Sequence, residues 1–285
     1  MAADAPPADT SVATAPSGRL APGPRRPTTR TERVGSVMTH HLAVYRRTWK
    51  GSIVGRFASP LFFLLSMGLG LGALVDDRAG GVGGLPYLRF VVPGILAMQA
   101  MMLAFGDSTY AVMGYIKWNR MYSAMLATPL RVGEVLGGHL AVVALQLAVA
   151  TAIFVAVAAP FGAFGSWWVL LAVPVAVLTG MAFAVPVFAL AARLEDDSGF
   201  SILFRFVMTP LMLFSGTFFP IDQLPGWMQP LAWVTPLWHG VELCRDASEG
   251  AWPGWAGAGH LAVLLVYVGV GWVLAHASFT RRLLS

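Results

Sequence analysis

The side chains that could carry out chemistry in this chain are few, and none of them completes a catalytic motif. His239, Glu242 and Cys244 are metal-ligating residue types within a short stretch, but their spacing matches no zinc motif. Cys244 is the single cysteine, which excludes an internal disulfide and a cysteine-based metal cluster. We therefore predict that the chain binds no metal.

The sequence lacks the motifs of two enzymatic functions. An intramembrane serine protease needs a serine in a Gly-x-Ser-Gly setting, whereas Ser215-Gly216 is preceded by Leu213 where the first glycine should stand; His260 and His276 follow as lone histidines. Hydrolysis of ATP at a P-loop needs Gly-x4-Gly-Lys-Ser/Thr, and the chain contains no Gly-Lys pair. We predict a protein that is not an enzyme and binds no cofactor of its own.

Asp107 is the only acidic residue well inside a long apolar stretch. Ionisable residues in a membrane interior are costly and usually functional, so Asp107 is a candidate proton site of a proton-coupled carrier. Such a carrier usually needs a second ionisable group, and the next two apolar stretches offer only His139. A structural role for Asp107 near the inner membrane boundary is the alternative, and the sequence leaves both open.

The elements that position these residues are predicted to be membrane-spanning helices. Of the 285 residues, 56% are hydrophobic and only 12% are charged, whereas a soluble domain has about 25% charged residues. A spanning helix needs about 20 apolar residues, and the uncharged stretch 135–192 suits two helices with a break at 160–165. We predict an all-α membrane protein with six transmembrane helices, drawn from the stretches 57–75, 90–116, 135–192 (two helices), 199–221 and 251–280.

The basic residues set the predicted orientation. Cytoplasmic loops of membrane proteins carry an excess of arginine and lysine. With both termini cytoplasmic, the outer segments hold only Arg78, Arg89 and Arg245 of the 19 basic residues. The net charge of +5 is then explained by orientation and by contact with membrane lipid, without nucleic acid. We predict a multi-pass protein of the bacterial cell membrane.

The N-terminal region divides into two parts. Residues 1–33 lack apolar periodicity and are predicted to be a disordered cytoplasmic tail, followed by a transmembrane domain over 34–285. Apolar residues then recur at helical spacing (Val34, Met38, Leu42, Tyr45, Trp49 and Ile53), which predicts an amphipathic helix lying in the inner membrane interface. This helix is either a simple anchor or a part that transmits movement into the first span. Its interfacial residues are Tyr45, Arg46, Arg47, Trp49 and Lys50.

The inner loop 117–134 is predicted to hold a short amphipathic helix. Trp118, Met121 and Met125 have helical spacing, and Leu126 widens their face. Thr128 and Pro129 look like the N-cap and first-turn proline of the next span. Because an apolar face on a cytoplasmic loop must cover something, we expect it to contact either the lipid interface or a partner protein.

The outer segment 215–250 is predicted to re-enter the membrane. Ser215-Gly216 interrupts the fifth span, and prolines then alternate with tryptophans. Non-helical backbone at membrane depth is tolerated only where protein or a cavity surrounds it. Short helices dipping into the outer leaflet fit this pattern, and a loop resting on the headgroups is the alternative. The residues concerned are Ser215, Gly216, Pro220, Pro225, Trp227, Pro236, His239, Glu242 and Arg245.

Four stretches resemble one protein family. Residues 121–130 (MYSAMLATPL) resemble the cytoplasmic motif of type-2 ABC-transporter permeases, in particular the nodulation protein J and daunorubicin-resistance branch. Residues 214–220 (FSGTFFP) and 236–242 (PLWHGVE), with Arg245, resemble the signature before the last helix, and 91–95 (VVPGI) matches the start of the second helix. The resemblance covers roughly 34–285. It departs at the start of the third span, where relatives often have Gly-Glu and we place Gly138-His139, with Glu134 nearby.

The resemblance implies a membrane subunit that dimerises and binds two copies of a separate ATPase, which uses ATP and magnesium. The segment 219–245 would cap the exit path, and the substrate would be amphipathic or hydrophobic, such as a lipid-linked oligosaccharide or an antibiotic. A proton-coupled carrier using Asp107 is the alternative function. The inner loop would supply the coupling helix to the ATPase, through Arg120, Met121, Met125, Leu126, Thr128 and Pro129.

Overall fold

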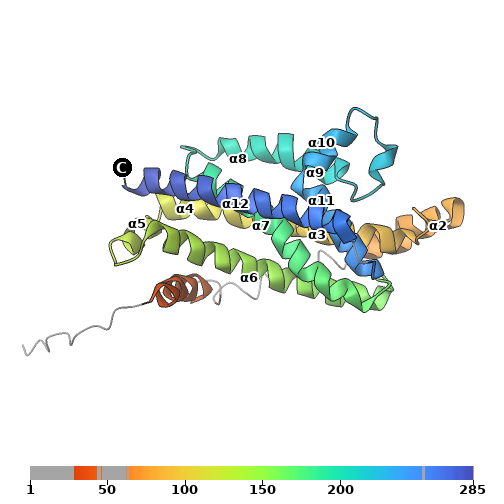
Figure 1. Ribbon diagram of the computed structural model, residues 1–285, viewed down its shortest axis with the longest axis horizontal. Helices are drawn as coiled ribbons and strands as arrows, with labels where there is room; N and C mark the ends of the chain where they lie inside the picture. Colours follow the sequence, from red (N-terminus) through yellow and green to blue (C-terminus); the bar gives the residue numbers. More distant parts are fainter. Residues whose placement is uncertain (1–28, 44–45, 47–61, 63, 252–253, 285) are drawn as a thin grey trace, which may run out of the picture.

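The computed structural model describes residues 29–43, 46, 62, 64–251 and 254–284, and in them the chain is built of helices joined by turns. Four segments are long and apolar enough to cross a membrane, and they run along the long axis of the molecule (Figure 1). They are α3 (Tyr87–Ser108) with α4 (Tyr110–Lys117), α6 (Val132–Ala158) with η2 (Ala159–Phe161), η3 (Trp167–Leu171) with α7 (Ala172–Ala191), and α12 (Gly254–Leu284).

The uncharged stretch 135–192 folds as two apolar segments, as the sequence predicts. The chain reverses between η2 and η3, where Gly162 has a left-handed φ of 71° that favours glycine. The backbone amides of Gly165 and Ser166 both donate to the carbonyl of Ser248, which ties this turn to α11 (Pro236–Glu249). The predicted break at 160–165 is therefore confirmed.

The two remaining predicted spans are less complete in the structure. The fifth corresponds to α8 (Ser198–Leu203), η4 (Phe204–Met208) and α9 (Thr209–Phe214), which together are shorter than the four long segments. The first corresponds to η1 (Leu65–Gly72) and α2 (Ala73–Ala79), and residues 57–61 and 63 of that stretch lie outside the described residues. The count of six spans therefore stays a prediction.

Helix α7 forms the centre of the bundle and packs against α3, α6, α11 and α12. Small residues allow the close approach. A Cβ atom at Gly271 of α12 would lie 2.8 Å from Cδ of Pro186, and a Cβ atom at Gly240 of α11 would overlap the side chain of Thr179. Since protein interiors are close-packed, these contacts hold α11 and α12 in register with α7.

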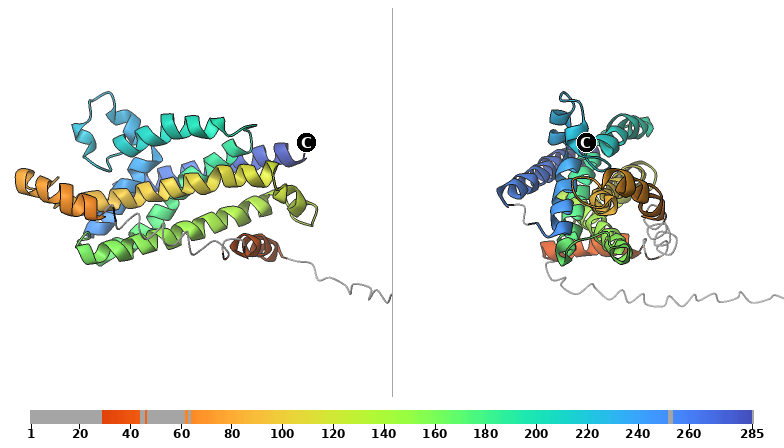
Figure 2. Two further views of the ribbon diagram at one scale, coloured as in Figure 1. Left: turned by 180° about the vertical axis from the view of Figure 1, so that it is seen from behind. Right: turned by 90° about the vertical axis from the view of Figure 1, so that its right-hand side faces the viewer.

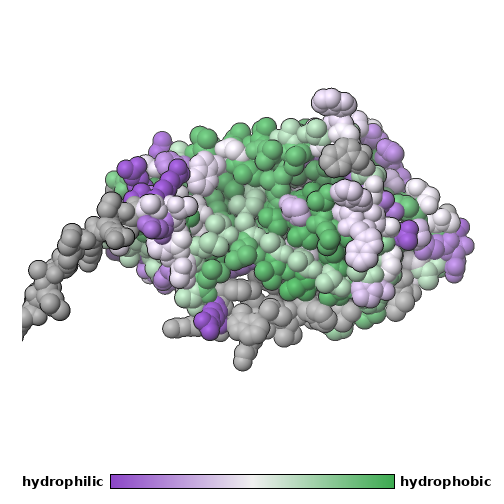
Figure 3. All heavy atoms as spheres, turned by 60° about the horizontal axis from the view of Figure 1, so that its bottom comes forward, coloured by the Kyte–Doolittle hydropathy of each residue, from purple (hydrophilic) through white to green (hydrophobic). Residues whose placement is uncertain are grey.

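The surface of the molecule shows an apolar belt. On the face in Figure 3, hydrophobic residues fill the middle and hydrophilic residues gather at the two ends. Helix α12 contributes several exposed apolar side chains to the surface, including Leu265, Val266 and Val273. An apolar outer surface is what a lipid environment requires of a spanning bundle.

An N-terminal helix covers residues 30–43, and it lies across the long axis of the bundle, beside α6 (Figures 1 and 2). It is placed near the end that carries α5 (Met121–Leu126) and the C-terminus. The helix begins before residue 34, so residues 30–33, predicted to belong to the disordered tail, are helical. Residues 1–28 of the predicted tail lie outside the described residues.

Candidate functional site

Helix α5 occupies a sharp corner between α4 and α6, at one end of the bundle (Figure 1). The corner begins at Arg120, which has a left-handed φ of 45° and is the only non-glycine residue in the described part with positive φ. Conformations of this kind are uncommon for a residue with a Cβ atom and persist only where the surrounding structure fixes them. Arg120 thus turns the chain so that α5 projects from the end of the span.

The predicted coupling residues divide into two groups in the structure. Arg120, Thr128 and Pro129 are exposed, whereas Met121 is half-buried. Met125 and Leu126 are also half-buried and pack against the hydrophobic core of the bundle. The apolar face predicted for a partner is therefore largely a face toward this protein's own core.

The exposed face of α5 consists of small residues that the sequence reasoning missed. Ser123, Ala124 and Ala127 are exposed, and their spacing of i, i+1 and i+4 places them on one side of the helix. Tyr122 is the only buried residue of α5. The sequence did carry a signal for this face, because the bulky Tyr122 is followed by the small Ser123 and Ala124. A bulky side chain marks the side of a helix that packs.

Thr128 and Pro129 do not begin the third span, so that prediction is wrong. The Thr128 hydroxyl instead donates to the carbonyl of Met125 at 2.5 Å, which closes the C-terminal end of α5. Helix α6 starts at Val132 after an extended Arg131. The cap comes from within the helix, because the carboxylate of Glu134 accepts the backbone N–H of Arg131 at 2.9 Å.

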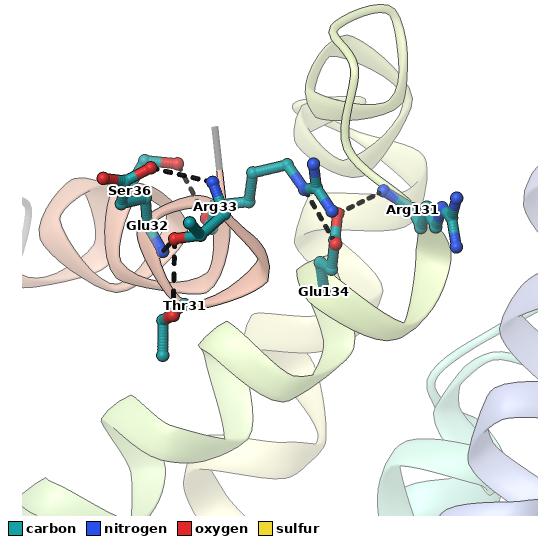
Figure 4. Close-up of polar contacts among 7 residues, drawn as sticks. Thr31, Glu32, Arg33, Ser36, Arg131 and Glu134 are labelled. Carbon is teal, nitrogen blue, oxygen red and sulfur yellow. Dashed lines mark hydrogen bonds and ion pairs between the residues drawn. The ribbon is translucent and has the colours of Figure 1, made fainter. Parts of the chain in front are cut away.

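Glu134 joins the N-terminal helix to α6 (Figure 4). Its Oε1 atom accepts a hydrogen bond from Nε of Arg33 at 2.8 Å, while its Oε2 atom accepts from the backbone of Arg131. The Glu134 side chain is only 4% exposed, and buried ion pairs are costly to break because the remaining charge is left unpaired. Because α6 begins at Val132, the pair in its first turn is Gly133-Glu134, and Gly138-His139, assigned from the sequence to the start of the third span, lies further into the helix.

A cluster of rings lies behind α5. The Tyr122 hydroxyl and Nδ1 of His139 share a hydrogen bond of 2.6 Å. The ring of His139 in α6 stacks on His41 of the N-terminal helix, with centroids 4.2 Å apart, and Tyr115 of α4 packs edge-on against both histidines. Phe188 of α7 and Phe279 of α12 complete the cluster. Five other helices therefore meet at the buried side of α5.

The electrostatics of the cluster favour uncharged rings. Burial, together with the nearby His40, lowers the pKa of His41 from 6.5 to about 4. Burial also raises the pKa of Tyr122 well above 10, and the neighbouring Tyr115 contributes in the same direction. His41 and Tyr122 are therefore neutral near pH 7. The cluster is a packed contact between helices and not a site for charged ligands.

The N-terminal helix uses a face that differs from the predicted one. Val37 and His41 are its buried residues, whereas Val34, Met38 and Leu42 of the predicted stripe are half-buried beside them. A Cβ atom at Gly138 of α6 would lie 2.7 Å from the Val37 side chain, which shows how closely the helices approach. The face turns because His41 reaches the ring cluster. Of the predicted interfacial residues, Arg46 is helical and exposed, and the others lie outside the described residues: Tyr45, Arg47, Trp49 and Lys50.

The segment after α9 is organised by Arg245 of α11. Its guanidinium donates to Glu242 at 2.7 Å and to the carbonyl of Gly216 at 2.9 Å, and it lies 4.0 Å above the ring of Phe90. Gly216 has a left-handed φ of 78°. Ser215 is buried and shares a hydrogen bond with Thr217 at 3.1 Å. The structure thus brings together four predicted residues: Ser215, Gly216, Glu242 and Arg245.

The remaining predicted residues of this segment lie around short helices. Pro220 precedes η5 (Ile221–Gln223), Pro225 and the exposed Trp227 precede α10 (Gln229–Val234), and Pro236 opens α11. Nδ1 of His239 lies 2.6 Å from Nδ1 of His260 in α12. The described residues contain no group of three or more potential metal ligands, and Cys244 is buried in the core. Asp107 is half-buried one residue before the end of α3.

An apolar cavity of about 650 Å³ separates the helix Ser198–Phe214 from α7 and α12. Its walls carry no charged side chain among the described residues. Helix α10 closes one side, and the Tyr267 hydroxyl of α12 donates to the carbonyl of Val234 beside it. The lining includes Phe183, Leu190, Phe206, Leu211, Met228 and Leu231.

Comparison with known proteins agrees with this arrangement. Residues 33–247 match the family described as ABC-2 type transporter. The chain is 37% identical to Nodulation protein J of Rhizobium leguminosarum bv. trifolii over 251 residues, which cover 85% of this chain and 94% of that protein. It is 35% identical to Nodulation protein J of Sinorhizobium fredii (strain NBRC 101917 / NGR234), covering 86% and 94%. The Inner membrane transport permease YadH of Escherichia coli (strain K12) is 25% identical over 71% of this chain and 77% of that protein. The resemblance inferred from the motifs is confirmed.

Proposed function

Because this chain belongs to the ABC-2 type transporter family, we propose that it is the permease subunit of an ATP-driven exporter. In this proposal a separate ATPase binds ATP and magnesium, and two copies of the chain and two ATPase copies form the transporter. The absence of a Gly-Lys pair in the sequence agrees with hydrolysis on another subunit. The chain itself is a multi-pass protein of the bacterial inner membrane.

The observation that carries the proposal is the division of α5 into two faces. Arg120, Ser123, Ala124 and Ala127 are exposed at the end of the bundle, where small side chains let another backbone approach closely. Tyr122 on the opposite face bonds to His139 in a cluster built by six helices. We propose that the ATPase binds the exposed face and that the ring cluster passes its movement into the spans.

The proposed transport cycle follows from two states of the ATPase. Closure of the ATPase dimer on ATP would move both coupling helices as rigid levers, which would open a path between the two permease copies. Such a shift requires that ATP and substrate contact the two states differently. At the opposite end, the segment 219–245 would re-enter the outer leaflet and cap the path, anchored by Arg245.

The proposed substrate is amphipathic or hydrophobic, either a lipid-linked oligosaccharide or a hydrophobic antibiotic. The cavity between α7, α12 and the helix Ser198–Phe214 supports this proposal, because its described walls carry no charge that would select an ion. A hydrocarbon portion gains about 25 cal/mol for each Å² of apolar surface that it removes from water.

The test is extraction of the tagged protein in a mild detergent, followed by identification of the proteins that co-purify. We expect a P-loop ATPase in equal amount to the permease. Ala124→Glu and Ala127→Glu should each remove the ATPase while the permease still inserts, because a charged side chain blocks a close helix contact. Ala251→Glu is the matched control, since Ala251 is also an exposed alanine but lies just after α11 and not on α5.

Two outcomes would contradict the proposal. Retention of the ATPase by both α5 variants would exclude the assigned face. Failure to find any ATPase with the unchanged protein, under conditions that preserve a known ABC complex, would favour the proton-coupled carrier. Transport should then depend on Asp107 and on the proton gradient.

A further inference from the structure

A basic cleft lies between the N-terminal helix, the first turn of α6 and the last turns of α12. Its volume is about 280 Å³. Its wall carries one acidic residue against three arginines and a histidine, the full lining being Arg30, Arg33, Arg131, Gly133, Glu134 and His276. Neither coupling to an ATPase nor passage of a substrate accounts for this accumulation of positive charge.

The single carboxylate in the cleft is already engaged within the protein. Arg33 binds one oxygen of Glu134, and the backbone N–H of Arg131 binds the other (Figure 4). The guanidinium of Arg131 extends away from Glu134 in the same view. Arg30 and Arg131 are exposed, and within the described part of the chain neither side chain forms an ion pair. The cleft therefore has at least two guanidinium groups available for an anion.

The position of the cleft indicates where that anion comes from. The N-terminal helix lies across the bundle axis, near the end that carries α5 and the C-terminus (Figures 1 and 2), which is the placement of a helix in the headgroup layer. The other two walls belong to α6 and α12, which are long and apolar enough to span the membrane. A cleft with these walls opens at the level of the lipid headgroups, on the side rich in basic residues.

We propose that this cleft binds the phosphate of an anionic phospholipid headgroup. Guanidinium groups match phosphate oxygens in paired hydrogen bonds, and basic pockets between spanning helices on the cytoplasmic side are suited to anionic headgroups. The bound lipid would fix the N-terminal helix against α6 next to Glu134. This proposal rests on the membrane placement of the chain and not on its partnership with an ATPase.

The test uses the full-length protein, purified in detergent and stripped of lipid, with phosphatidylglycerol added back. Native mass spectrometry measures the fraction of protein that retains the lipid. We expect Arg30→Gln with Arg131→Gln to weaken retention by at least about tenfold, since the double variant loses charge-assisted hydrogen bonds to the phosphate. Arg46→Gln is the matched control, because Arg46 is also an exposed arginine but does not line the cleft.

Each alternative occupant gives a different result. Equal losses with Arg46→Gln would show general attraction to a charged surface and would overturn the site. Equal retention of phosphatidylcholine would overturn selectivity for an anionic headgroup, and displacement by millimolar inorganic phosphate would assign the cleft to free phosphate. Unchanged lipid retention by the double variant, with loss of a co-purifying protein instead, would assign the cleft to that protein. The exposed positions of both arginines make misfolding separable, because the melting temperature without lipid should not change.

Discussion

Replacing Tyr122 with phenylalanine removes one hydroxyl from the only buried residue of α5. The ring and its packing stay, so the change isolates the 2.6 Å hydrogen bond to Nδ1 of His139. A buried polar atom that loses its partner costs about 1–3 kcal/mol. We expect the variant to lose this amount of stability, without a cavity term, because phenylalanine fills the same space.

The assay is thermal unfolding of the purified protein in detergent, with Tyr115→Phe as the matched control. Tyr115 packs in the same cluster, but its hydroxyl makes no hydrogen bond within the described residues. We therefore expect Tyr115→Phe to melt close to the unchanged protein and Tyr122→Phe to melt clearly lower. Adding His139→Phe to Tyr122→Phe should recover part of the loss, because both polar partners are then replaced by apolar rings.

A double-mutant cycle decides the question, since two residues in contact show coupling energies of about 0.5–3 kcal/mol. A coupling energy near zero between Tyr122→Phe and His139→Phe would refute the reasoning that this bond holds α5. Equal melting temperatures for Tyr122→Phe and Tyr115→Phe would refute it as well. In the complex with an ATPase, we expect Tyr122→Phe to lower transport per ATP hydrolysed, because α5 then moves more freely than the spans.

Three further predictions follow from individual contacts. The pKa of His41 is lowered from 6.5 to about 4, so its contribution to stability is complete above pH 6.5 and is lost as the pH falls toward 4. At pH 5 we expect His41 to account for a loss of about 2 kcal/mol, so that His41→Phe loses less stability than the unchanged protein by this amount, measured by melting at pH 5 and 7.5. Gly240→Ala places a Cβ atom against Thr179 and should reduce the yield of folded protein, whereas Gly106→Ala, which meets nothing within 4 Å, should not. Arg245→Lys keeps the charge but cannot reproduce the paired contacts of the guanidinium, so protease digestion from the outer side should cleave the segment after α9 faster; unchanged cleavage would argue against Arg245 as its anchor.

Much of the fold could be predicted because the bilayer imposes a simple rule on sequence. Charges are costly in the hydrocarbon layer, so the uncharged stretch 135–192 marked two helices, and their turn falls where Gly162 can adopt a left-handed conformation. The exact starts of helices were harder to predict. Thr128-Pro129 has the chemistry of a helix start, yet the carboxylate of Glu134 provides the cap and moves the start to Val132.

The candidate site could be located but not oriented from the sequence. Met125 and Leu126 were assigned to a partner because apolar residues on a loop must be covered, and in the structure this protein's own core covers them. Periodicity shows that a helix has an apolar face but does not show which molecule packs there. His41 illustrates the same limit, because a polar residue type gave no signal that its ring would stack in a buried cluster.

In the proposed coupling role, the two faces of α5 would let a six-residue helix transmit force. An isolated helix of this length is not stable in water, so the ATPase could not move the spans through α5 unless other contacts held it rigid. Tyr122 supplies such contacts on one side, and the left-handed Arg120 fixes the angle at which α5 leaves α4. The N-terminal helix adds a second constraint, since Arg33 pairs with Glu134 of α6 and His41 stacks on His139, five residues further along the same helix. In the proposed mechanism, movement of the ATPase against the small exposed face would reach α4, α6 and the N-terminal helix together. A variant that weakens the ring cluster should then uncouple movement without preventing ATPase binding.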